Sequence, residues 1–147
     1  MLTLAEFVIG SIGCVGKLQC QEEDSDSMAK VMVVDDAKSE LKLMEGILKS
    51  AGLDVVCLPD GEQLEERVVQ ERPDLLLLDI VMPHRNGYEI LRSLKRDGRT
   101  QAVPVVLVSS KNQESDRVWG KRQGADEYLG KPFTAEQLVT VVRQFIR

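Results

Sequence analysis

Polar side chains stand directly after four short apolar runs of this 147-residue chain. They are Asp35 and Asp36, Asp79, Ser109 and Lys131. If the chain brings the carboxylates together, two of them about 4 Å apart repel by roughly 4 kcal/mol at an effective dielectric near 20, so a cation has to offset the charge. Hard oxygen ligands and retained water suit Mg²⁺ better than zinc. The acidic residues therefore predict a magnesium site.

Lys131 and Ser109 add groups that suit a phosphoryl ligand. A lysine ammonium is a point charge of the kind that binds phosphate, and a serine hydroxyl can donate to a phosphoryl oxygen. With a carboxylate as nucleophile, the set fits in-line attack of Asp79 on phosphorus and formation of an aspartyl phosphate. Taken singly, Asp36, Ser109 and Lys131 have plainer interpretations as a helix-terminal acid, a helix cap and a surface lysine. Their combined placement after separate apolar runs favours the chemical interpretation.

The run that ends at Asp79 indicates how these groups are positioned. Its consecutive leucines are too few to span a membrane, and Pro73 and Pro83 bound the run, so it predicts a strand buried on both faces. Four more strands are expected, at residues 31–34, 54–58, 103–108 and 127–129. Helices are expected from Ser39 as N-cap to residue 51, over 62–71, from 86–87 onward, over 113–123, and from Thr134 as cap to the end of the chain.

The alternation of strands and helices predicts an α/β fold. The arrangement expected is a flavodoxin-like (βα)5 three-layer sandwich, with a parallel five-stranded sheet of order 2-1-3-4-5. In that order the first and third strands are neighbours at the switch point, where ligands of open α/β sheets bind. Asp35, Asp36 and Asp79 would then share one crevice.

Composition narrows the classes of function. The net charge of −5 gives no basic footprint for nucleic acid, and the 43% of hydrophobic residues is ordinary for a globular domain. Three cysteines without a CxxC pair and a single histidine argue against a disulfide framework and a zinc site, and favour the reducing cytoplasm. No membrane span is expected, because the apolar start of the chain is short and carries Glu6 and Lys17.

Two parts of the chain differ in character. Residues 1–28 are expected to be a flexible N-terminal extension, with a short amphipathic anchor or docking helix as the alternative. Residues 29–147 carry the whole alternating pattern and are expected to form one domain.

On these residues the chain resembles a response-regulator receiver domain of the CheY type, from Ala29 to Arg147. The family pattern is an acidic pair, a phospho-accepting Asp, a Ser or Thr, and a Lys-Pro. This chain has Asp35-Asp36, Asp79, Ser109 and Lys131-Pro132 in that order. The resemblance implies a phosphorylation-dependent signalling switch of a two-component system, which is not an enzyme beyond catalysing its own phosphorylation and dephosphorylation.

The resemblance implies an acceptor and a set of metal ligands. Asp79 takes the phosphoryl group from the phosphohistidine of a histidine kinase. Asp36, Asp79 and the backbone carbonyl of Val81 ligate Mg²⁺ directly, and Asp35 acts through water. Because Val81 cannot position a water molecule, especially fast hydrolysis of the phosphorylated protein is not expected.

The resemblance also implies a relay from the acceptor to the surface. Lys131 pairs with the acyl phosphate, Ser109 moves to hydrogen-bond it, and Tyr128 follows as an aromatic switch. The bond between Lys131 and Pro132 is expected to be cis, which is rare outside X-Pro bonds and uncommon even there.

Residues 79–89 and 109–125 are similar to single-domain regulators of type IV pilus, twitching and phototaxis systems. This likeness implies a CheA-like histidine kinase as phosphodonor and a downstream protein target, with a pilus-motor protein as the candidate. Trp119 is either partial core or a partner contact. The partner face would be formed by the helix at 113–123, the strand at 127–129 and the last helix, and Tyr128 is assigned to it as well.

Three other functions are weighed against this one. A phosphatase of the haloacid-dehalogenase type needs a second Asp two residues after the first, where this chain has Val81. A flavin-binding module needs a phosphate loop after the first strand, where Asp35 and Asp36 would repel a bare phosphate. A receiver-like module that binds proteins without being phosphorylated stays open as the alternative.

Overall fold

A parallel sheet forms the centre of the computed structural model, which describes residues 29–83, 85–111 and 113–146. The predictions made for residues 1–28 lie outside these residues. The five strands are β2 (Lys30–Val34), β3 (Asp54–Leu58), β4 (Leu75–Asp79), β5 (Val105–Ser109) and β6 (Glu127–Gly130). They lie in the order β3-β2-β4-β5-β6, and every neighbouring pair is parallel. This is the predicted order 2-1-3-4-5, so the flavodoxin-like fold is confirmed.

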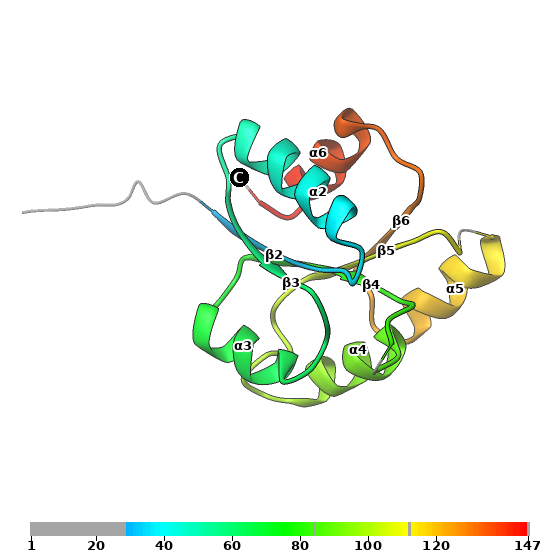
Figure 1. The fold of residues 1–147 in the computed structure, drawn as a ribbon. Coiled ribbons are helices and arrows are strands. Elements are labelled where there is room, and N and C mark those ends of the chain that lie inside the picture. Colours follow the sequence, from blue (N-terminus) through cyan, green and yellow to red (C-terminus); the bar gives the residue numbers. More distant parts are fainter. Residues whose placement is uncertain (1–28, 84, 112, 147) are drawn as a thin grey trace, which may run out of the picture.

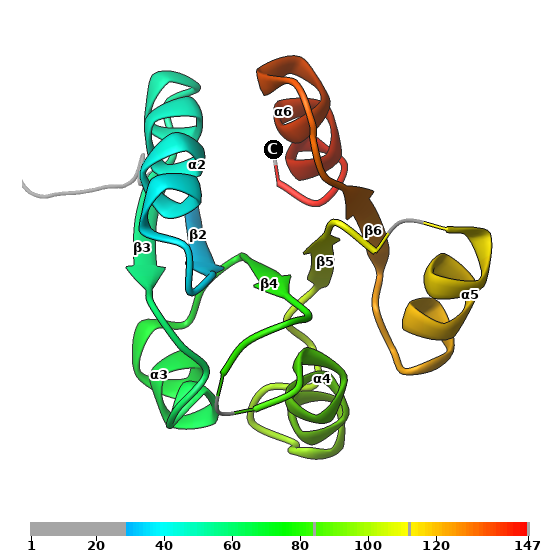
Figure 2. The same ribbon diagram turned by 45° about the vertical axis from the view of Figure 1, so that its right-hand side comes forward.

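Helices cover both faces of the sheet (Figure 1). They are α2 (Lys38–Ser50), α3 (Leu64–Glu71), α4 (Gly87–Arg96), α5 (Glu114–Arg122) and α6 (Ala135–Arg143). In Figures 1 and 2, α2 and α6 lie on one face and α3 and α4 on the other, with α5 beside β6 at the edge. The three layers follow from the alternating pattern of the chain.

The leucine run of β4 packs against both helical layers. All five residues of the strand are buried. Leu75 and Leu77 belong to the core cluster that includes α2 and α6, whereas Leu76 and Leu78 belong to the cluster that includes α3 and α4. Since successive side chains of a strand point to opposite faces, a strand between two helical layers has to be apolar throughout.

Several predicted boundaries differ from the structure. The last helix was expected to continue to the end of the chain, but α6 ends at Arg143. Ser39 is not the cap of α2: the helix begins at Lys38, because the Asp35 carboxylate accepts the N–H of Ala37 at 3.0 Å and organises an earlier turn. Helix α3 begins at Leu64 because Gln63 has a left-handed backbone with φ of 56°. Strand β5 begins at Val105, after a proline that has no N–H to donate. The predicted cap Thr134 is confirmed, since its side chain accepts a backbone N–H of α6. Asn86 caps α4 in the same way, which the sequence had not been used to predict.

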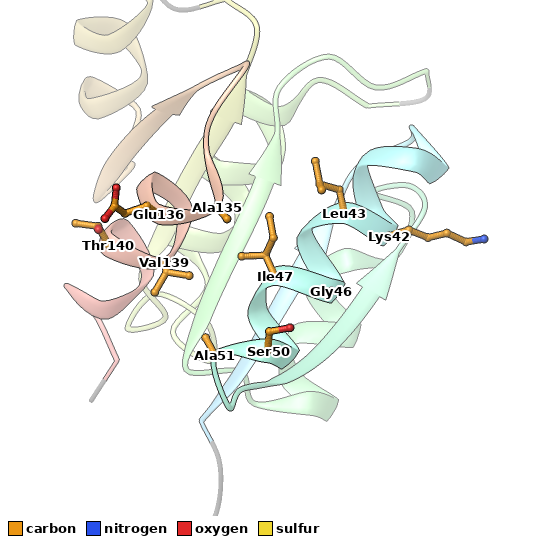
Figure 3. A pocket seen from close by; sticks show the side chains of 10 residues that line it. All are labelled: Lys42, Leu43, Gly46, Ile47, Ser50, Ala51, Ala135, Glu136, Val139 and Thr140. Carbon is orange, nitrogen blue, oxygen red and sulfur yellow. The ribbon is translucent and has the colours of Figure 1, made fainter.

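A groove runs between α2 and α6, away from the strand ends that carry the candidate chemistry (Figure 3). Leu43, Ile47 and Val139 contribute aliphatic side chains to it, and Lys42 and Glu136 are the residues of its lining that carry charge. The groove thus lacks the convergent carboxylates that the predicted chemistry requires. Within the part of the chain that the structure describes, no helix is both long enough and apolar enough to span a bilayer.

Candidate functional site

Three carboxylates converge where β2 and β4 end side by side. Val34 is paired with Leu78, so Asp35 and Asp79 follow at the same edge of the sheet. Carboxylate oxygens of Asp35, Asp36 and Asp79 lie within 4.8 Å of one another. The Asp35 and Asp79 residues are only 1% and 7% exposed, whereas Asp36 is exposed. The structure therefore brings together the acidic residues that the sequence singled out.

Lys131 reaches the same crevice from the loop that follows β6. Its backbone N–H donates to the carbonyl of Ser109 at 2.8 Å, which holds the loop against the end of β5. The Nζ atom lies 2.8 Å from Oδ2 of Asp35 and 3.8 Å from Oδ1 of Asp79. The peptide bond to Pro132 is cis, as predicted. Lys131 is thus the cation that faces the buried carboxylates.

The electrostatics of the crevice are dominated by burial and by excess negative charge. Burial raises the pKa of Asp79 to about 6, against the lowering effect of Lys131, and Asp35 raises it further. Burial alone would lower the pKa of Lys131, but its hydrogen bond to Asp35 and its ion pair with Glu40 outweigh that effect, so the pKa is raised. One lysine therefore faces several carboxylates, and an additional cation would stabilise their ionised forms.

The donor set fits a hard divalent cation. Asp35, Asp36 and Asp79 supply carboxylate oxygens. Val81 lines the same crevice and is 56% exposed to solvent. Oxygen donors with room for retained water are what Mg²⁺ prefers, in contrast to the nitrogen and sulfur ligands of zinc.

Gly87 allows α4 to begin directly against the end of β4. Its N–H donates to the carbonyl of Ile80 at 2.8 Å. A Cβ atom on Gly87 would lie 2.5 Å from the carbonyl oxygen of Asp79 and 2.6 Å from Cα of Ile80. Only glycine fits such an approach. The sequence identified Gly87 as a helix start, but its role in placing α4 behind the acceptor strand is visible only in the structure.

Ser109 and Tyr128 lie between the crevice and α5. Ser109 is buried at the end of β5, and its hydroxyl accepts the N–H of Lys111 at 3.1 Å. The hydroxyl of Tyr128 donates to the carbonyl of the same Lys111, and the ring is buried. Burial raises the pKa of Tyr128 to about 12. The segment around Lys111 therefore connects the two residues that the family resemblance links as a switch.

Trp119 lies on the surface of α5 with its side chain half exposed. The residue is 48% exposed, and its ring meets that of Tyr88 edge to face, with centroids 6.4 Å apart and an interplanar angle of 80°. The guanidinium of the neighbouring Arg117 lies 5.5 Å from the centroid of the Tyr128 ring. Trp119 is therefore more a surface aromatic than a core residue, which favours the partner-contact interpretation.

Two charged contacts near the site were not foreseen from the sequence. Glu40, on the first turn of α2, forms an ion pair with Lys131. Arg85 clamps Glu65 through two hydrogen bonds of 2.8 and 2.7 Å and also donates to the carbonyl of Gly61, fixing the loop that leads into α4. Glu40 could have been suspected because it follows the acidic pair by about one helical turn, but no local pattern pairs Arg85 with Glu65 across 20 residues.

Comparisons with known proteins identify the family. Residues 31–143 match the family model described as the response regulator receiver domain. The protein PilH of Pseudomonas aeruginosa is 42% identical over 115 residues, which cover 78% of this chain and 95% of PilH.

The fold of this chain is also similar to solved structures of other proteins. The chemotaxis protein CheY4 of Vibrio cholerae is 27% identical with a TM-score of 0.76, over 82% of this chain and 100% of that one. The receiver domain of a sensor histidine kinase of Pseudomonas aeruginosa, with a magnesium ion coordinated in its active-site cleft, is 25% identical with a TM-score of 0.75. That match covers 82% of this chain and 98% of the other.

Proposed function

The chain belongs to the response regulator receiver domain family, and on that premise we propose that it is a phosphorylation-dependent switch whose acceptor is Asp79. The observation that carries the proposal is the crevice itself. The Asp79 carboxylate is buried beside Asp35 and Asp36 and lies 3.8 Å from the Lys131 ammonium. A nucleophilic carboxylate, a pair of further carboxylates and a fixed cation are the parts that transfer of a phosphoryl group to aspartate requires.

In the proposed reaction, one oxygen of Asp79 attacks the phosphorus of a phosphohistidine on a histidine kinase. The new O–P bond forms as the P–N bond breaks, and the imidazole leaves with the electron pair of that bond. When bound, Mg²⁺ would be held by Asp36, Asp79 and the carbonyl of Val81, with Asp35 acting through water, and would offset negative charge on the phosphoryl oxygens. Lys131 would then pair with the phosphoryl group on Asp79.

The proposed output is a change in the surface formed by α5, β6 and α6. Ser109 would turn its hydroxyl from the Lys111 amide to the phosphoryl group, and Tyr128, hydrogen-bonded to the carbonyl of Lys111, would respond. Phosphorylation would shift an existing equilibrium and alter the affinity of the surface around Trp119 for a partner protein.

The similarity to PilH supports a place in pilus-based motility or taxis. The phosphodonor would be a CheA-like histidine kinase, and the target a downstream protein related to the pilus motor. Such a kinase is phosphorylated from ATP, so the proposal places both proteins in the cytoplasm. Residues 29–147 would form the receiver domain, while nucleic acid has no part in the proposed mechanism.

Intact mass after incubation with acetyl phosphate tests the proposal. One added phosphoryl group is expected in the presence of Mg²⁺, and none without the metal or in the Asp79→Asn variant. Asp54→Asn is a matched control, since Asp54 is an exposed carboxylate at the start of β3, the opposite end of the sheet. Absence of uptake by the folded wild-type protein under all conditions would overturn the proposal and favour a binding module that works without phosphorylation.

A further inference from the structure

The ammonium group of Lys131 is shared between two carboxylates, and neither belongs to Asp79. Nζ lies 2.8 Å from Asp35 and forms an ion pair with Glu40, whereas Asp79 is 3.8 Å away. A lysine has three N–H donors on one compact charge, so contacts with two carboxylates occupy most of its capacity. A phosphoryl group on Asp79 would therefore compete with Asp35 and Glu40 for Lys131.

The ion pair between Glu40 and Lys131 is not explained by the capping role that a Glu usually has at this position of a helix. It is the third residue of α2, a position from which a Glu side chain often reaches back to the N-cap N–H. Here the Asp35 carboxylate accepts that N–H, which belongs to Ala37, and leaves the Glu40 side chain to another role. Its Oε1 atom is shielded from solvent although the side chain as a whole is 41% exposed. The carboxylate is thus turned inward, toward Lys131.

We propose that Glu40 is a positioning residue that competes with the phosphoryl group for Lys131 and so limits how readily Asp79 is phosphorylated. The inference rests on the proposed function of Asp79. Glu40 reaches the crevice from α2, whereas Lys131 belongs to the loop after β6, so their ion pair joins two elements that line the crevice. An incoming phosphoryl group is anionic, and Glu40 both repels it and holds the cation that would bind it.

Glu40→Gln tests this proposal, with Glu45→Gln as the matched control. Both variants remove one negative charge from α2 and keep the size of the side chain, but Glu45 pairs with Lys49 on the same helix. The probe is beryllofluoride with saturating Mg²⁺, a non-covalent mimic of the phosphoryl group, titrated by amide chemical shifts. Glu40→Gln is expected to bind it about fivefold more tightly than the wild type, because a change of that size matches the strength of a half-exposed ion pair. Glu45→Gln is expected to bind it like the wild type.

Affinity for Mg²⁺ alone separates a positioning role from a structural one. Removal of an anion near the crevice should leave Mg²⁺ affinity unchanged or lower it, while the affinity for beryllofluoride rises. A variant that merely loosens the site would lose affinity for both. Equal affinities for beryllofluoride in Glu40→Gln and Glu45→Gln would overturn the inference.

A shorter carboxylate gives a second test should Glu40→Gln not fold. Glu40→Asp keeps the charge but lacks one methylene, and it is expected to bind beryllofluoride with an affinity between those of the wild type and Glu40→Gln. An affinity equal to that of the wild type would contradict the inference. Failure of the wild-type protein itself to bind beryllofluoride would instead contradict the proposed function of Asp79, so the two failures are distinguishable.

Discussion

Helices α4 and α5 follow neighbouring strands of the sheet, but they are held in different ways. In α4, Asn86 caps the first turn and Ile90, Leu91 and Leu94 are buried. In α5, Gly120 is the buried residue, and Trp119 is half exposed. The helix after the acceptor strand is therefore fixed by side-chain packing, whereas α5 is held by a close backbone approach that buries little apolar surface.

The two helices have different roles in the proposed mechanism. The proposed acceptor Asp79 has to keep its geometry, and α4 packs directly behind it through Gly87. Helix α5 lies next to Tyr128 and carries the exposed aromatic of the proposed partner surface. A helix with few buried apolar contacts is one whose position a modest free-energy change can alter. The contrast between the two helices is thus what a fixed site with a responsive surface requires.

The largest effect is expected from truncating the buried side chains of α4. Leu91→Ala should lower the free energy of unfolding by about 3 kcal/mol, because Leu91 is fully buried and leaves a cavity. Trp119→Ala in α5 should lower it by less than about 1 kcal/mol, although more atoms are removed. Urea denaturation of both variants measures the difference. Similar losses of stability in the two variants would contradict the contrast between the helices.

A smaller effect is expected from the clamp that fixes the entry to α4. The hydrogen bonds from Arg85 lower the pKa of Glu65 to about 2, against the opposing effect of burial. Because the folded-state pKa lies below the unfolded value, this carboxylate stabilises the protein fully above pH of about 4.5 and loses that contribution as the pH falls towards 2. The loss is roughly 2 kcal/mol after allowance for partial exposure.

Denaturation at near-neutral and strongly acidic pH checks this prediction. The pH dependence of the free energy of unfolding should be smaller in Glu65→Gln than in the wild type. Glu66→Gln is the control, because it removes a more exposed carboxylate from the same helix. The prediction is wrong if the Glu65→Gln variant loses as much stability on acidification as the wild type does.

The smallest effect concerns the close approach of α5 to the sheet. A Cβ atom on Gly120 would lie 2.9 Å from a methyl carbon of Leu107 and 3.1 Å from the ring of Tyr128, so in Gly120→Ala these side chains or the helix have to shift. The free-energy cost of this overpacking exceeds the gain in helix propensity from Gly to Ala, so a net destabilisation of about 1 kcal/mol is expected. Gly46→Ala in α2, where a Cβ meets nothing within 4 Å, should instead stabilise by up to about 1 kcal/mol.

Urea denaturation, followed by the fluorescence of the single tryptophan Trp119, measures the stability of the two glycine variants. Opposite signs for Gly120→Ala and Gly46→Ala are expected. A stabilising Gly120→Ala would mean that α5 moves away from the sheet without cost, and would make the helix still more weakly held than its packing indicates.

The order of the strands and the convergence of the carboxylates could be predicted because they depend on local signals. A fully apolar strand such as Leu75–Asp79 requires helices on both faces, and parallel strands place their carboxyl ends at one edge. Asp35, Asp36 and Asp79 meet because β2 and β4 are also neighbours, as the flavodoxin-like strand order predicts.

Contacts between side chains that are distant in the sequence could not be predicted and are seen only in the folded structure. Lys131 was assigned to the acceptor, but its ammonium lies closer to Asp35 and pairs with Glu40, whose position depends on where α2 begins. That beginning in turn depends on the Asp35 side chain, which replaces Ser39 as the organiser of the first turn. Which groups lie at this edge of the sheet could be read from the apolar runs, because backbone periodicity and hydrophobic burial act locally. Which carboxylate holds the lysine was left to the packing of three separate elements, since an ion pair depends on distances that no local pattern contains.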